Sequence, residues 1–215
     1  MFTDQQKKIL LRWARQTIEE ELGQQATAPV TKKELDDPEL RQHRGVFVTL
    51  NLAGMLRGCI GSLLGLEPLI AGVRRHAVNA ALRDNRFPLL TVDELTEVVI
   101  EISVLTPPQN LEYGDSQDLV SLLQPRIDGV ILKVPEGPGA TFLPQVWEQL
   151  PEPETFLRQL CLKAGLPADS WQQGNLTVQT YQACHLVYLD RLQLLPMQHQ
   201  QVRSGVNQKL LTLTE

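Results

Sequence analysis

The sequence predicts an α+β fold with antiparallel sheets, and three observations support this. Residues 46–50 and 56–61 are two apolar segments on either side of a turn that contains Gly54, a pattern typical of a β-hairpin. Residues 98–105 show the strongest strand pattern in the chain, with residues 98, 100, 102 and 104 on one face and residues 99, 101, 103 and 105 on the other. Helical and extended segments do not alternate regularly, which favours α+β over a parallel βαβ arrangement.

The N-terminal half is predicted to contain two longer helices. Thr3 is a suitable N-cap for a helix that runs to about Leu22, in which apolar residues recur at helical spacing. A second helix follows Pro68 and ends near Arg83, with its apolar residues on one side. Because this helix comes directly after the hairpin, we expect the two to pack together. A short helical turn begins at Thr91.

Shorter elements are predicted after Pro107-Pro108, which is the best candidate for a subdomain boundary. Two helices and three strands are expected there, over residues 116–123, 154–164, 129–134, 140–143 and 177–189. Residues 191–215 are weakly patterned, and we expect part of this tail to be flexible.

Composition narrows the functional classes. The formal net charge of −5 argues against a general nucleic-acid binder, which usually has a basic face. No apolar run approaches the roughly 20 residues of a membrane span, and residues 1–21 lack the apolar core of a signal peptide. The three cysteines are odd in number and widely spaced, which supports neither a disulfide framework nor a zinc ribbon. We therefore expect a cytoplasmic protein without a membrane segment.

The candidate site lies in the second strand of the hairpin, Leu-Arg-Gly-Cys-Ile-Gly at 56–61. The two-residue period of a strand puts residues 56, 58 and 60 on one face and residues 57, 59 and 61 on the other. Arg57 and Cys59 should then project side by side. Glycine inside a strand leaves room for a ligand or another backbone, so Gly58 and Gly61 are predicted binding residues.

Cys59, Arg57 and Glu101 are the candidate catalytic residues, and each has a structural alternative. A thiol beside a cation can become a nucleophilic thiolate, but most free cysteines are small buried apolar residues. Arg57 either binds an anionic ligand or forms an ion pair, with Glu101 as the expected partner. Burial would raise the pKa of Glu101 and suit it to acid–base chemistry, whereas exposure would make it one polar residue on a sheet face.

Two further groups of residues complete the candidates. Arg86 either pairs with Asp84 or faces a ligand, and Phe87, held extended before a proline, anchors the same loop; both are predicted binding residues. His76 fits a partly buried histidine with its hydrogen bonds satisfied, and His185 and Cys184 should point to opposite faces of the last strand. No metal-ligand spacing or cofactor motif occurs, so we expect neither a metal nor a cofactor.

The hexapeptide at 56–61 resembles the signature of the AMMECR domain family, also called AmmeMemoRadiSam system protein A. Companion segments occur in the family's order at 84–88, 101–105, 128–130 and 142–146. The resemblance implies a two-subdomain α+β protein whose signature lines a cleft between the subdomains. It also implies that residues 1–109 plus 183–215 form the larger subdomain and that residues 110–182 are an inserted smaller one.

Two functional hypotheses follow. In the first, the protein is an enzyme, or an accessory to a modification pathway, that acts on a protein, peptide or other sizeable substrate. The resemblance implies a MEMO-like protein and a radical SAM protein as pathway partners. In the second, the same cleft belongs to a non-catalytic adaptor that binds a protein or peptide.

Overall fold

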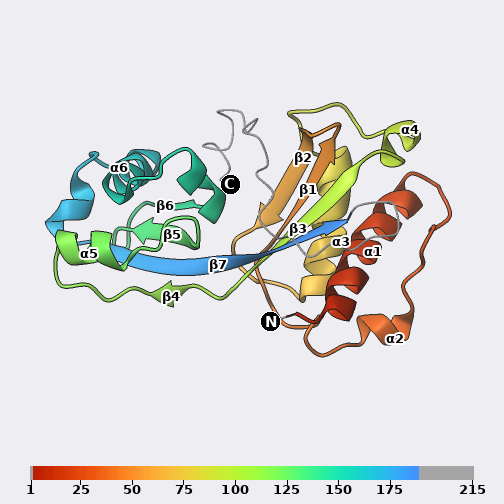
Figure 1. Ribbon diagram of the computed structural model, residues 1–215, viewed down its shortest axis with the longest axis horizontal. Coiled ribbons are helices and arrows are strands. Elements are labelled where there is room, and N and C mark those ends of the chain that lie inside the picture. The colour runs from red at the N-terminus through yellow and green to blue at the C-terminus, as the bar shows by residue number, and fades with distance from the viewer. Residues whose placement is uncertain (1, 189–215) are drawn as a thin grey trace. The chain divides into compact units, whose positions relative to one another are not determined.

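The structure, a computed structural model, describes residues 2–188 in two units that each have a hydrophobic core (Figure 1). Unit 1 contains residues 2–105 and 184–188, and unit 2 contains residues 106–183. Both units combine helices with antiparallel strands, so the α+β prediction is confirmed. The subdomain limits and the cleft implied by the family resemblance stay predictions, and the tail at 191–215 lies outside the described residues.

Unit 1 supplies most of the long elements. They are α1 (Asp4–Glu21), α2 (Lys32–Leu35), β1 (Val46–Leu52), β2 (Met55–Ser62), α3 (Leu69–Leu82), α4 (Val92–Leu95), β3 (Val99–Leu105) and the end of β7 (Thr177–Tyr188). Thr3 caps α1 as predicted: its Oγ1 accepts a hydrogen bond from the backbone N–H of Gln6, and the Gln6 side chain bonds back to the Thr3 N–H.

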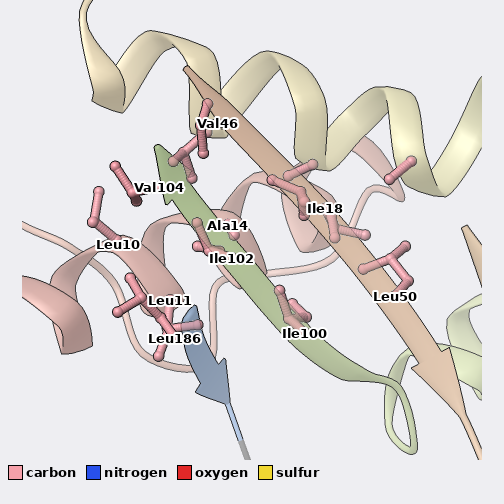
Figure 2. Packing of buried hydrophobic residues seen from close by; sticks show 14 of the residues in the cluster. Leu10, Leu11, Ala14, Ile18, Val46, Leu50, Ile100, Ile102, Val104 and Leu186 are labelled. Carbon is pink, nitrogen blue, oxygen red and sulfur yellow. The ribbon is translucent and has the colours of Figure 1, made fainter. Parts of the chain in front are cut away.

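The strands of unit 1 run in the order β2-β1-β3-β7. Helices α1 and α3 cover one face of this sheet (Figure 1). Alternate residues of each strand point into that core, which explains the two-residue apolar period of the sequence. Figure 2 shows the side chains of α1, such as Leu10 and Ile18, beside Leu50, Ile102 and Leu186 of three strands. The opposite face of the sheet is therefore set apart from the helices.

Unit 2 has its own antiparallel sheet. Its elements are β4 (Gln109–Asn110), α5 (Ser116–Leu122), β5 (Asp128–Lys133), β6 (Gly139–Phe142), the 3₁₀ helices η1 (Pro144–Glu148) and η2 (Ser170–Gln173), α6 (Pro153–Lys163) and the first part of β7. Strand β5 lies between β6 and β7, and β4 pairs with β7. The ring of Trp147 stacks on Phe156 in the core, with centroids 3.7 Å apart.

Each of the five elements predicted after the double proline is present within one residue or two of its expected limits, up to the end of the described residues. The two 3₁₀ helices and β4 were not predicted. Among the helices of residues 2–188, none has the length and apolar character that a membrane span requires.

Candidate functional site

The predicted hairpin is present, but it contains a bulge at Arg57. Strands β1 and β2 pair with Thr49 opposite Cys59 and Leu50 opposite Gly58, whereas Asn51 already pairs with Leu56. One residue of β2 therefore has no partner, which is the definition of a β-bulge. The bulge interrupts the strict alternation that was expected to place Arg57 beside Cys59.

The guanidinium of Arg57 is held by the segment that follows α3. Its Nε and Nη2 donate to the two carboxylate oxygens of Glu94 at 2.8 and 3.0 Å. It also donates to the carbonyl oxygens of Pro88 and Leu89 at 2.8 and 3.1 Å. The hydrogen bonds from Arg57, with others from Thr91, lower the pKa of Glu94 to about 2. The expected partner, Glu101, is thus corrected to Glu94, and Arg57 joins the bulge to this segment.

Cys59 lies in a buried environment. Its side chain is 6% exposed, and Thr49 Oγ1 donates a hydrogen bond to Sγ at 3.2 Å. Burial raises the pKa of the thiol, while the bond from Thr49 and the positive charge of Arg86 act in the opposite direction. The cation that acts on the thiol is thus Arg86 and not Arg57. This environment favours the protonated thiol at neutral pH.

Asp84 and Arg86 together bind the backbone of Cys59. Asp84 Oδ2 accepts the Cys59 N–H at 2.9 Å, and Arg86 Nη2 donates to the Cys59 carbonyl at 3.0 Å. The two side chains also bond to each other, at 2.6 and 2.8 Å. Of the two roles considered for Arg86, the structure thus contains pairing with Asp84. The guanidinium also lies 5.5 Å from the ring centroid of Phe87, which is half-buried.

The two glycines of the hairpin allow close packing within unit 1. A Cβ at Gly58 would lie 2.1 Å from the carbonyl oxygen of Ala80, so this glycine admits the backbone of α3. A Cβ at Gly61 would lie 2.2 Å from ring atoms of Phe47, so the Phe47 ring occupies the space above Gly61. For Gly58, another backbone thus fills the space that was considered for a ligand.

Glu101 lies on the face of the sheet opposite α1 and α3, which we call the polar face. Its members are Phe47, Thr49, Asn51, Cys59, Gly61, Val99, Glu101, Ser103 and His185. Glu101 is directly opposite Thr49, which is opposite Cys59, so the three form one row across β3, β1 and β2. Asn51 Nδ2 donates to Glu101 Oε1 at 2.9 Å. Burial raises the pKa of Glu101, and the bond from Asn51 opposes this effect.

A second polar pair on this face was not predicted. Ser103 Oγ and His185 Nδ1 lie 2.9 Å apart, on β3 and β7. The alternation did predict that Ser103 shares a face with Glu101 and that Cys184 and His185 point to opposite faces. Cys184 packs against the core of unit 1. The sequence held no signal that β7 lies next to β3, so the pairing across 82 residues was missed.

His76 is more deeply buried than expected. It is 2% exposed, and its Nδ1 has no hydrogen-bond partner among the described residues. Burial, together with the charge of Arg75, lowers the pKa of His76 to about 4, so the ring is neutral at pH 7. Within residues 2–188 we find no group of three or more metal-ligating side chains.

Comparisons with known proteins agree with this fold. A family model described as AMMECR1 matches residues 11–186. A relative from Methanothermobacter thermautotrophicus is 39% identical over 82% of this chain and 91% of its own length. Protein PF1979 from Pyrococcus furiosus is 37% identical over 84% of this chain and 87% of its own. The crystal structure of uncharacterized protein PH0010 from Pyrococcus horikoshii superimposes with a TM-score of 0.71 at 34% identity, covering 86% of this chain and 92% of that one.

Proposed function

Because this chain belongs to the AMMECR1 family, we propose that it is an accessory component of a modification pathway and recognises a protein or peptide segment. Recognition takes place on the polar face of unit 1. The MEMO-like and radical SAM proteins named in connection with the family are the proposed pathway partners, and the chemical step then belongs to one of them.

The state of the Glu101 carboxylate carries this proposal. It is half-buried beside an asparagine, and no ion pair to it occurs among the described residues. Carboxylates taken out of water are normally paired with a cation or with several N–H donors. One amide donor leaves most of the acceptor capacity of Glu101 unused. A ligand that brings an ammonium or guanidinium group would satisfy it.

A basic peptide segment fits these requirements. It supplies the cation for Glu101, and the chain's net charge of −5 favours its approach. Thr49, the half-buried middle residue of the same row, offers a neutral contact to the ligand. Of the predicted binding residues, Arg57 and Gly58 do not contact the ligand in this proposal; they hold the hairpin in its shape.

Catalysis by a Cys59 thiolate is the alternative, and two observations count against it. Burial raises the pKa of the thiol, which reduces the thiolate fraction on which nucleophilic attack depends. The strand of Glu101 lies two strands away from that of Cys59, or about 10 Å at the usual strand spacing, so Glu101 is too far to take its proton directly.

Binding of a fluorescein-labelled decalysine peptide to the full chain tests the proposal. We expect Glu101→Gln to weaken binding about tenfold or more, the usual value of a hydrogen bond to a charged group. Glu97→Gln is the matched control, because Glu97 is an exposed carboxylate of the same unit; we expect a change below twofold. Acetylated decalysine should not bind. Equal affinity of the Glu101→Gln variant and the unchanged protein would contradict the proposal.

A further inference from the structure

The Ser103–His185 pair on the polar face has no part in the proposed recognition of a cation. A hydroxyl and an imidazole at 2.9 Å are the two groups of a nucleophile and its general base. Both come from strands of unit 1, which hold them more rigidly than loops would. His185 is exposed and Ser103 is half-buried, so both can meet a ligand.

We infer that Ser103 is an acyl-accepting nucleophile and His185 its general base, which gives unit 1 hydrolytic activity toward activated esters and thioesters. This activity goes beyond the proposed function, since it does not require a cationic ligand at Glu101.

The surroundings of Ser103 support this assignment. Phe47 is its direct neighbour on β1, and Gly61 is the neighbour of Phe47 on β2. Because the Phe47 ring lies over Gly61, it leans toward β2 and away from Ser103. The glycine thus keeps the ring off the hydroxyl and leaves an apolar surface beside it. That surface suits the hydrocarbon part of an acyl group.

The histidine is in the protonation state that the reaction needs. Although His185 is exposed at the surface, the protein around its ring removes part of its hydration and lowers its pKa. The neutral imidazole is therefore favoured at pH 7, and its Nδ1 can accept a proton from Ser103. Cys59 is not served by this base, because β2 and β7 are three strands apart, or about 14 Å at the usual spacing.

The reaction balances with water as the only co-reactant. Ser103 Oγ forms a bond to the carbonyl carbon, and its proton moves to His185 Nδ1. The tetrahedral intermediate then breaks its bond to the leaving alcohol or thiol, which takes the proton from His185. Water attacks the acyl-serine with the same histidine as base, and the carboxylic acid leaves as Ser103 recovers its proton.

A structural role is the alternative, in which the pair only links β3 to β7. Such a pair would contribute roughly 1 kcal/mol to stability and would not react with an electrophile. A fluorophosphonate–rhodamine probe separates these roles, because it labels a serine that an adjacent base activates. The full chain is incubated with the probe, and the labelled residue is located by mass spectrometry of its peptides.

We expect the folded protein to be labelled at Ser103 and to hydrolyse p-nitrophenyl acetate. Ser103→Ala should abolish both signals, and His185→Gln should reduce both about a hundredfold, the usual lower value for losing a general base. Ser62→Ala is the matched control, because Ser62 is a half-buried serine of β2 whose Oγ bonds to the Leu64 carbonyl. It should label like the unchanged protein.

Absence of label at Ser103 in the folded, unsubstituted protein would overturn the inference, whatever the stability of the variants. Labelling that persists in the His185→Gln variant would overturn the assignment of the base. The labelling measurement contains no cationic ligand, and the decalysine measurement contains no electrophile. Failure of the decalysine test with normal labelling would therefore reject only the proposed recognition, and the reverse result would reject only the hydrolytic activity.

Discussion

The two faces of the unit 1 sheet differ in the polarity of the side chains that they bury. The face under α1 and α3 is apolar at every strand position that it buries, as at Val48, Leu50 and Ile102. The polar face has a carboxylate and hydroxyls that are half-buried, beside an exposed imidazole. Stability alone would favour apolar or fully exposed residues at such positions. The difference shows that one face holds the unit together, and it supports the proposal that the other binds a ligand.

The largest loss of stability should follow a substitution on the face covered by α1 and α3. We expect Ile102→Ala to lower the free energy of unfolding by about 2–5 kcal/mol, because it leaves a cavity in a core where Ile102 is fully buried. Val99→Ala, on the polar face of the same strand, should cost less than half as much. Urea unfolding of both variants measures the two values. A larger loss of unfolding free energy for Val99→Ala than for Ile102→Ala would show that the polar face, too, holds the unit together.

A smaller loss of stability is expected when Arg57, at the bulge, is replaced. Arg57→Ala removes both bonds to Glu94 and the bonds to two carbonyls, and we expect a loss of about 1–3 kcal/mol. Arg57→Lys should recover only part of it, since an ammonium lacks the forked geometry. Arg83→Ala, an exposed arginine at the end of α3, should change stability by less than about 0.5 kcal/mol. Chemical unfolding again provides the measurement.

The thiol of Cys59 should lose its proton at a higher pH than an ordinary cysteine. Because burial raises its pKa, we expect iodoacetamide to react with Cys59 in the folded protein with a midpoint above the ordinary value of about 8.5. The rate is followed against pH by mass spectrometry of the Cys59 peptide. A midpoint below that value would instead show an activated thiolate and return Cys59 to the candidate nucleophiles.

The smallest change in stability should come from Glu101→Gln, and it should be a gain where the other substitutions cause a loss. The pKa of Glu101 is raised in the folded protein, so the unfolded chain releases this proton first and stability falls as pH rises above about 4. Glu101→Gln removes this cost. We expect its melting temperature at pH 7 to rise by about 2 °C, or about half to one kcal/mol for a chain of this size.

The gain should disappear near pH 3, where the carboxyl is protonated in both states. A melting temperature that falls at pH 7 would show that the carboxylate is stabilised by partners inside the protein, which would also remove the basis for a cationic ligand. Stabilisation combined with weaker decalysine binding is the pattern expected of a residue retained for function.

The sequence was sufficient for the parts of the site that depend on local periodicity. The alternation in residues 98–105 separated Ile102, which is buried, from Glu101 and Ser103 on the other face. The turn at Gly54 and the apolar residues around it were sufficient to predict the hairpin. These features depend only on the two-residue period of a strand and on turn chemistry.

The rest depended on contacts between distant segments. The bulge at Arg57 follows from the register of two strands, which the hairpin pattern does not determine. Glu94 became the partner of Arg57 because a short helix after α3 brought it there. His185 reached Ser103 only because the chain returns from unit 2 to pair beside β3. No residue pattern around Ser103 or around His185 indicated that the two side chains lie together.

The loop that binds the Cys59 backbone has a consequence for association between molecules. In the described part of the chain, β2 is the outer strand of its sheet, and an outer strand with free N–H and C=O groups invites pairing with another chain. Asp84 and Arg86 occupy these groups in the middle of β2, and their opposite charges would have to be displaced by any incoming strand. The loop therefore acts as a safeguard against aggregation, next to the residues on which the proposed function depends.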